Sequence, residues 1–149
     1  MRSRFVRPDT AILELSDGDT LTVKKRLTSG EQRAAFDRAS VPSADGTPIL
    51  LRQKSWVAMI TAYLLDWSFC DEAGKRVEIA GKPVDDVIAA LDALDIESFF
   101  EVKEAIDAHE ARMLAEREQE KNGQGNATGS PVISPLPDAV TGATSGSLT

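Results

Sequence analysis

Apolar and polar residues alternate along the first part of the chain, and this pattern predicts a β-hairpin over residues 11–25. Ile12, Leu13 and Leu15 precede an Asp-Gly step, and apolar residues alternate with threonines after it. Glycine accepts the positive φ angle of a tight turn, so an Asp-Gly step between two such runs is a strong hairpin signal. Residues 1–27 are therefore expected to form an N-terminal arm and a hairpin.

A short helix is predicted over residues 29–39. Thr28 is followed three residues later by Glu31, which is the spacing of a capping box at a helix start. Residues 41–48 follow this helix and contain two prolines and a glycine. That composition predicts a loop without regular structure.

The most apolar helix of the chain is predicted over residues 54–67. Its apolar residues recur at three- and four-residue spacing, at Trp56, Ile60, Tyr63, Leu64 and Trp67. These aromatic side chains are expected to lie in the core. Residues 72–75 then predict a turn and residues 76–79 a short extended arm. The pattern leaves open whether residues 76–82 form a strand beside the hairpin or a loop.

Two further helices are predicted with almost no linker between them, so they should form a helical hairpin or turn a sharp corner. Pro83 is expected at the first position of one helix, with acidic residues in its first turn, where the helix dipole favours them. Asp95 is placed to cap the other helix, which continues to about residue 121. Its apolar stripe comprises Ile96, Phe99, Phe100, Ile106 and Met113. Its carboxylates are expected on the opposite, outer face, at Glu97, Glu101, Glu104, Asp107 and Glu110.

The composition changes after residue 122. Residues 123–149 hold one charge, five glycines and three prolines, which predicts a disordered, low-complexity tail. The fold class expected from the whole pattern is α+β and mainly α. It combines the N-terminal hairpin with a small helical core domain over residues 28–122 and the C-terminal tail over residues 123–149.

Charge and hydropathy exclude several classes of protein. The chain has a net charge of −7, and residues 85–122 hold twelve acidic and four basic side chains. Such an acidic surface repels a phosphate backbone, so nucleic-acid binding is not expected. There is no apolar run of membrane-spanning length and no apolar stretch after the basic N-terminus, so neither a membrane span nor a secretory signal is expected.

The sequence offers no arrangement that predicts catalysis. It has no Gly-rich phosphate loop and no metal-binding spacing of histidines and cysteines. Cys70 is the only cysteine, which fits a reducing cytoplasm, and we expect it to be a small buried hydrophobic residue. His109 is the only histidine and is expected to be half buried. The chain is therefore not expected to be an enzyme or to bind a cofactor or a metal.

Four segments spread over residues 20–122 together carry a resemblance to a known family. They are an opening of the type VKKRLTSGEQRAAFDRA, a helix ending in Tyr-Leu-Leu-x-Trp-Ser at residues 63–68, and a short Asp-x-x-Gly-Lys turn at residues 71–75. The fourth is a terminal helix with Leu-Asp at residues 94–95, an aromatic at Phe99 and the run from Ala105 to Glu110, ahead of the low-complexity tail. In these respects the chain resembles the tail assembly chaperones of long-tailed, siphovirus-like bacteriophages and prophages.

This resemblance implies a function in virion assembly. Such chaperones bind the long, aggregation-prone tape-measure protein in the host cell cytoplasm, keep it soluble and help to recruit tail-tube subunits, and they are absent from the mature virion. Many members self-associate. The surface expected to bind the partner is the part of the terminal apolar stripe that stays exposed, from Ile96, Phe99, Phe100, Ile106 and Met113. For Phe99 and Ile106 the alternative, which the pattern favours, is a place in the core.

Two other functions stay open at this point. The chain is alternatively a structural component of the virion, such as a minor tail protein or a head-tail connector protein. An enzyme or small-molecule binder would instead require a pocket that brings Cys70 and His109 together. In many relatives a programmed ribosomal frameshift also makes a longer product. The codons of Glu120-Lys121-Asn122 contain a slippery heptamer if they are GAA AAA AAC.

Overall fold

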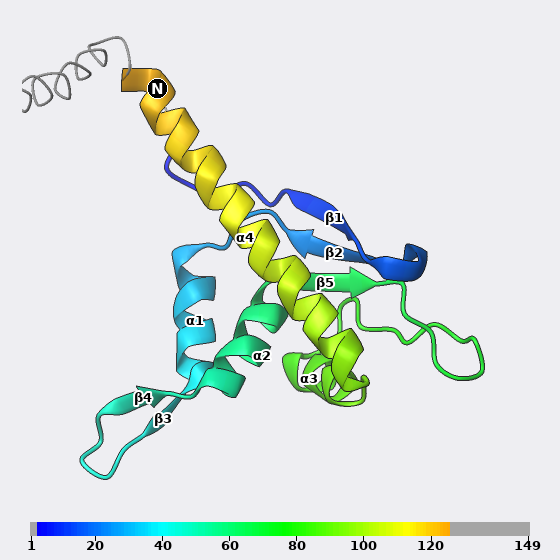
Figure 1. The fold of residues 1–149 in the computed structure, drawn as a ribbon. Helices are drawn as coiled ribbons and strands as arrows, with labels where there is room; N and C mark the ends of the chain where they lie inside the picture. The colour runs from blue at the N-terminus through cyan, green and yellow to red at the C-terminus, as the bar shows by residue number, and fades with distance from the viewer. Residues whose placement is uncertain (1–2, 126–149) are drawn as a thin grey trace, which may run out of the picture. The chain divides into compact units, whose positions relative to one another are not determined.

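The computed structural model describes residues 3–125, and the chain divides into two compact units, Met1–Met113 and Leu114–Thr149. Figure 1 shows the elements, which in order are β1 (Thr10–Glu14), η1 (Ser16–Gly18), β2 (Thr20–Lys24), α1 (Ser29–Ala39), β3 (Ser40–Pro42), β4 (Pro48–Leu50), α2 (Arg52–Tyr63), β5 (Leu64–Trp67), α3 (Val84–Asp92) and α4 (Ile96–Gly125). The α+β fold with an N-terminal hairpin followed by helices is as predicted. The first three residues of the predicted disordered tail, 123–125, belong instead to α4, and the rest of the tail lies outside the described residues.

The N-terminal hairpin forms where the sequence predicts it. Strands β1 and β2 pair antiparallel, and β2 also pairs antiparallel with β5, so the sheet order is β1-β2-β5. Asp17 and Gly18 have positive φ angles of 58° and 82°, which is the left-handed backbone that a tight connection needs. The capping box of α1 is also present, because Thr28 and Glu31 each accept a hydrogen bond from the other's backbone N–H.

The predicted helix over residues 54–67 is wrong in its last turn. Helix α2 ends at Tyr63, and Leu64 leaves it with extended φ and ψ angles of −72° and 124°. The next residues form strand β5, in which Asp66 pairs with Thr22 of β2. A short apolar run is compatible with either a helix or a strand. Here the strand forms, because pairing with β5 satisfies the backbone N–H and C=O groups along the edge of β2 that β1 leaves open.

The predicted loop over residues 41–48 is confirmed for residues 43–47 and wrong at its ends, where β3 and β4 pair into a small two-stranded sheet that extends away from the helices in Figure 1. Two backbone hydrogen bonds flank the strands, from Leu51 N–H to the Ala39 carbonyl and from Ser43 N–H to the Thr47 carbonyl. They determine which residue pairs between β3 and β4 are hydrogen-bonded. Because bonded and non-bonded pairs alternate, Pro42 and Pro48 fall at a non-bonded pair. A proline there costs no hydrogen bond, so the hairpin tolerates both.

The hairpin and the helices share one hydrophobic core. It includes Leu21 and Val23 of β2, Ile60 of α2, Leu91 of α3 and Ile106 of α4, each at most 1% exposed. Within the first unit, α4 crosses the sheet in Figure 1. Within the first unit, the predicted N-terminal hairpin and the helices that follow it therefore meet in a single core.

The segment between β5 and α3 contains the predicted turn, and it corrects the expectation for Cys70. The Asp71 carboxylate accepts hydrogen bonds from the N–H groups of Ala73 and Lys75, both at 2.9 Å. Cys70 is exposed and not buried as predicted, because the chain has already left the sheet at that point. It forms an isolated bridge with Arg76, and residues 77–82 form no strand.

Candidate partner-binding groove

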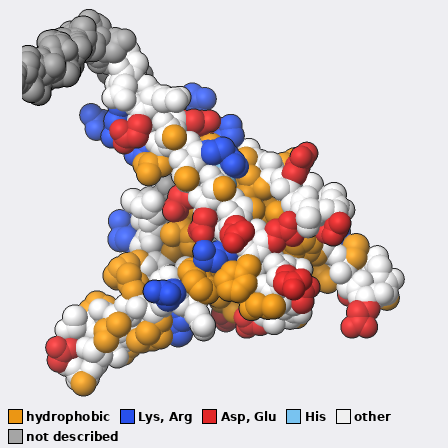
Figure 2. Space-filling model, in the orientation of Figure 1, with side chains coloured by type: hydrophobic (Ala, Val, Ile, Leu, Met, Phe, Trp, Pro, Cys, Tyr) orange, Lys and Arg blue, Asp and Glu red, His pale blue; other side chains and the backbone are white. Residues whose placement is uncertain are grey.

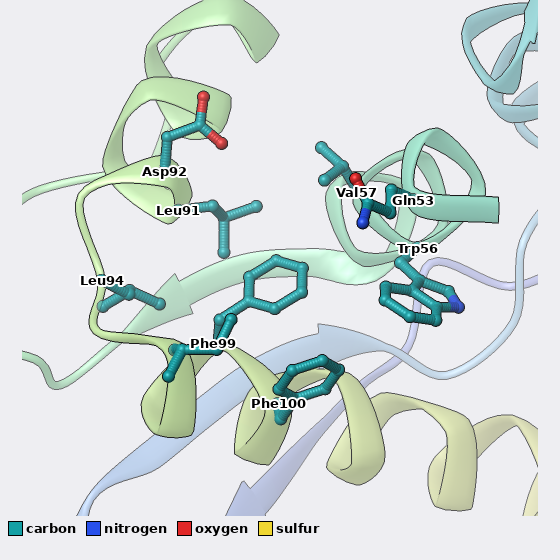
Figure 3. A pocket seen from close by; sticks show the side chains of 9 residues that line it. Gln53, Trp56, Val57, Leu91, Asp92, Leu94, Phe99 and Phe100 are labelled. Carbon is teal, nitrogen blue, oxygen red and sulfur yellow. The ribbon is translucent and has the colours of Figure 1, made fainter. Parts of the chain in front are cut away.

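An open, mostly apolar hollow of roughly 340 Å³ lies where α2, α3 and the first turns of α4 meet. Figure 3 shows residues of α2 on one side of it and residues of α3 and of the α3–α4 connection on the other, with the rings of α4 between them. We call it the aromatic groove, and it is lined by Gln53, Trp56, Val57, Leu91, Asp92, Leu94, Ile96, Phe99 and Phe100.

The groove exists because α3 and α4 turn a corner with almost no linker, as the sequence predicts. Helix α3 ends at Asp92, and α4 begins four residues later at Ile96. Asp95 caps α4, because its carboxylate accepts hydrogen bonds from Ser98, from the backbone N–H and from the hydroxyl, both at 2.8 Å. These bonds, the backbone one foremost, hold the pKa of Asp95 below its usual value. The cap thus fixes the first turn of α4, which carries the groove's phenylalanines.

Aromatic rings pack edge to face along the groove. The rings of Trp56 and Phe100 lie 5.6 Å apart at an angle of 69°, and those of Phe99 and Phe100 lie 5.8 Å apart at 77°. Such pairs contribute about 0.5–1.5 kcal/mol each beyond their buried area. The Lys103 ammonium lies 5.0 Å from the centre of the Trp56 ring and also pairs with Asp107. These contacts hold Trp56 in place and leave part of the rings open to solvent.

The side of the groove formed by the end of α3 and the start of α4 is acidic. Asp92 lines the groove, and Asp95 and Glu97 are exposed next to it. On the α2 side, Arg52 and Lys54 are exposed on either side of Gln53. Figure 2 shows hydrophobic side chains gathered over the start of α4, with basic side chains toward α2 and acidic ones on the opposite side.

The structure divides the five residues predicted to bind a partner. Ile96, 66% exposed, and Phe100, 36% exposed, are accessible in the groove, and Phe99 is half buried there. Ile106 is 1% exposed and belongs to the core, which is the alternative that the sequence pattern favoured for this residue, so it is not accessible to a partner. Met113 is half buried and does not line the groove.

Helix geometry explains this division. The buried face of α4 carries Val102, Ile106 and His109, three and four residues apart. Each residue advances about 100° around a helix, so Phe100 cannot share this face with Phe99. The spacing pattern placed both phenylalanines on one stripe and did not identify Val102 as a core residue. It also predicted Trp56 in the core. That Trp56 instead lines the groove beside Phe100 depends on a contact between two helices that are distant in the sequence.

Two carboxylates predicted to be solvated on the outer face of α4 instead bond to other elements. The Glu101 carboxylate accepts hydrogen bonds from the Ser16 backbone N–H at 2.7 Å and from its hydroxyl at 3.0 Å. The Glu110 carboxylate accepts one from the Tyr63 hydroxyl at 3.2 Å. These bonds tie α4 to the hairpin turn and to α2, which residue spacing alone could not reveal.

His109 and Cys70 do not form a joint site. The His109 ring is 1% exposed, and its Nε2 donates a hydrogen bond to the Lys24 carbonyl at 2.9 Å, so the residue is more buried than predicted. Cys70 is exposed, and neither residue lines the groove. Among residues 3–125 no group of three or more His, Cys, Asp or Glu side chains is placed to hold a metal ion. In the same part of the chain no helix is long and apolar enough to cross a membrane.

The lining of the groove suits the binding of apolar side chains. Gln53 and Asp92 are its only polar lining residues, and the other seven are apolar.

Comparison of the chain with protein-family models, with curated proteins and with solved structures found no match.

Proposed function

We propose that this protein is a tail assembly chaperone of a long-tailed bacteriophage or prophage. It binds the tape-measure protein in the host cell cytoplasm, keeps it soluble and promotes assembly of the tail tube around it. The proposal combines the family resemblance of residues 20–122 with one structural observation, the aromatic groove. A binding function fits this groove better than catalysis, since its lining lacks paired acid and base groups.

The groove suits a helical partner in size and character. Its volume of roughly 340 Å³ lies at the lower end of the ~300–1,000 Å³ typical of ligand pockets, so it holds a few side chains and not a whole helix. An amphipathic helix docks in this way, with anchors from one face inserted into an apolar groove. A tape-measure protein is largely helical with apolar stripes and offers such anchors repeatedly along its length.

Co-expression with the tape-measure protein tests the proposal directly. We expect this partner to be encoded by a very long open reading frame immediately downstream of the chaperone gene. We expect the wild-type chain to raise the soluble yield of that partner and the Phe100→Asp variant to lose most of this effect. Phe36→Asp is the matched control, because Phe36 is 49% exposed on α1 and lies outside the groove. An unchanged yield with the wild-type chain, or equal loss in both variants, contradicts the proposal.

The alternative function as a virion structural protein has a separate test. A chaperone is expected to be missing from purified particles, whereas a minor tail protein or connector component is present in them. Mass spectrometry of purified virions distinguishes the two. Detection of the chain in stoichiometric amount would replace the chaperone proposal by the structural one.

A frameshifted longer product is part of the same proposal, since it accompanies many relatives. The codons of Glu120, Lys121 and Asn122 decide it. A slippery heptamer there, followed by an overlapping reading frame, predicts a second and longer protein in infected cells. Other codons, with no slippery run nearby, remove this part of the proposal and leave the binding function unaffected.

A further inference from the structure

The outer edge of β1 presents unpaired backbone groups. Strand β1 lies at the end of the sheet order, and within residues 3–125 no other segment pairs with that edge. Hydrogen bonds run from Lys25 N–H to the Asp9 carbonyl and from Leu15 N–H to the Asp19 carbonyl. They determine which residue pairs between β1 and β2 are hydrogen-bonded. Because bonded and non-bonded pairs alternate, the N–H and C=O groups of residues 10, 12 and 14 point away from β2.

The β1 edge carries few of the features that usually prevent strands from pairing with another chain. Such features include prolines and charged side chains, lysine above all, and β1 holds one of them, Glu14 at its last position. The β3–β4 hairpin has prolines at two outward-facing positions, Pro42 and Pro48. The β1 edge has no proline or lysine, and Ile12 at its centre is 68% exposed. The same molecule thus blocks one pair of edges and leaves another open.

The edge is complementary to itself in the antiparallel direction. With Ile12 opposite Ile12 of a second copy, Thr10 lies opposite Glu14, and the outward groups of all three residues pair. Exposed Arg4, Arg7 and Asp9 precede the strand and leave one net positive charge there, whereas exposed Glu14 and Asp17 lie at its end and just beyond. Antiparallel pairing brings the basic end of one copy beside the acidic end of the other. A parallel pairing in register would instead place like charges together, which is unfavourable.

We propose that two copies of this chain associate through the outer edges of β1, antiparallel about a two-fold axis at Ile12. The pairing joins the two three-stranded sheets into one and buries the two Ile12 side chains against each other. The same patch serves both copies, as two-fold symmetry requires. This surface is distinct from the aromatic groove and does not depend on the proposed chaperone function.

Site-specific cross-linking tests the register. In a Cys70→Ser background, which removes the exposed native thiol, Ile12→Cys places two thiols at the axis, with Cα atoms about 5.5 Å apart. Thr10→Cys is the matched control, because its two copies lie roughly 13 Å apart along the strands. A short bifunctional thiol reagent is expected to give a covalent dimer of the Ile12→Cys chain only. A mixture of Thr10→Cys and Glu14→Cys chains should give a heterodimer.

Sedimentation analysis of the full-length chain tests the energetics. Ile12→Lys places two positive charges opposite each other and is expected to raise the dimer dissociation constant about tenfold or more. Ile49→Lys is the control, since Ile49 is similarly exposed on β4 and should leave association unchanged. Circular dichroism checks that both variants fold. A wild-type chain that stays monomeric, an Ile12→Lys dimer as tight as wild type, or equal cross-linking at positions 10 and 12 would overturn the proposal.

Discussion

Tyr63 shows how a single side chain connects two helices, α2 and α4. It ends α2, it is 4% exposed, and its ring meets that of His109 edge to face at 5.7 Å. Its hydroxyl donates to the Glu110 carboxylate. Burial, followed by the negative charge of Glu110 and this hydrogen bond, raises the pKa of Tyr63 to about 12 from the usual 10.0. The neutral phenol is therefore favoured by the folded state.

Titration of this phenol is a prediction at the residue scale. Because the pKa is higher in the folded state, the stabilisation is complete below pH 10 and is lost as the pH rises from about 10 to about 12. The chain has one tyrosine, so the change in ultraviolet absorbance that accompanies phenol ionisation reports Tyr63, whereas the two tryptophans do not ionise. We expect a midpoint near 12 in native protein and near 10 in denaturant. Glu110→Gln should lower the native midpoint but leave it above 10, since burial remains. A native midpoint of 10 contradicts the buried placement.

At the scale of elements, the cap of α4 determines the shape of the groove. Asp95 follows the α3–α4 corner directly, and its bonds to Ser98 satisfy a backbone N–H that the helix leaves unpaired. The same turn holds Ile96, Phe99 and Phe100 against α2 and α3. A looser cap would therefore affect the groove as well as the helix.

Asp95→Ala is the corresponding prediction. The loss of a capping side chain costs about 0.5–2 kcal/mol of the free energy of unfolding. Denaturant unfolding measures this loss, and partner binding through the groove should weaken in parallel. Asp95→Asn keeps a capping oxygen and is expected to stay close to wild type. If alanine and asparagine at this position behave alike, the cap does not contribute as described.

At the scale of the whole molecule, the core and the candidate binding surface lie on the same helix. Ile106 is buried against the sheet, whereas Ile96, ten residues earlier, is two-thirds exposed at the groove. The sequence pattern placed both isoleucines on one apolar stripe and favoured the core for Ile106. In the structure Ile106 is buried in the core, whereas Ile96 stays accessible to a partner.

A pair of matched substitutions tests this division. Ile106→Ala removes buried methyl groups and is expected to cost about 2–5 kcal/mol of the free energy of unfolding. Ile96→Ala removes the same atoms from an exposed position and should change stability by no more than about 0.5 kcal/mol. Chemical denaturation compares the two variants. Similar losses in both would mean that Ile96 is also part of the core.

Much of the fold was predictable because the deciding interactions are local. The Asp-Gly turn, the capping box of Thr28 and Glu31 and the cap at Asp95 each depend on residues a few positions apart. The errors are of the opposite kind. Strand β5 replaces the last helical turn because β2 offers it an edge, and the prolines of β3–β4 are tolerated because of their place in the ladder. Neither fact is contained in a short stretch of sequence.

The sequence by itself determined where the chain turns, where its helices start and which segments are apolar, since backbone preference and residue spacing act within a few residues. Only the tertiary structure decided which apolar residues face the core and which face solvent. That choice depends on contacts between elements far apart in the chain, as between Trp56 and Phe100 or between His109 and Lys24. The groove and the open β1 edge are what remains uncovered once those contacts have formed.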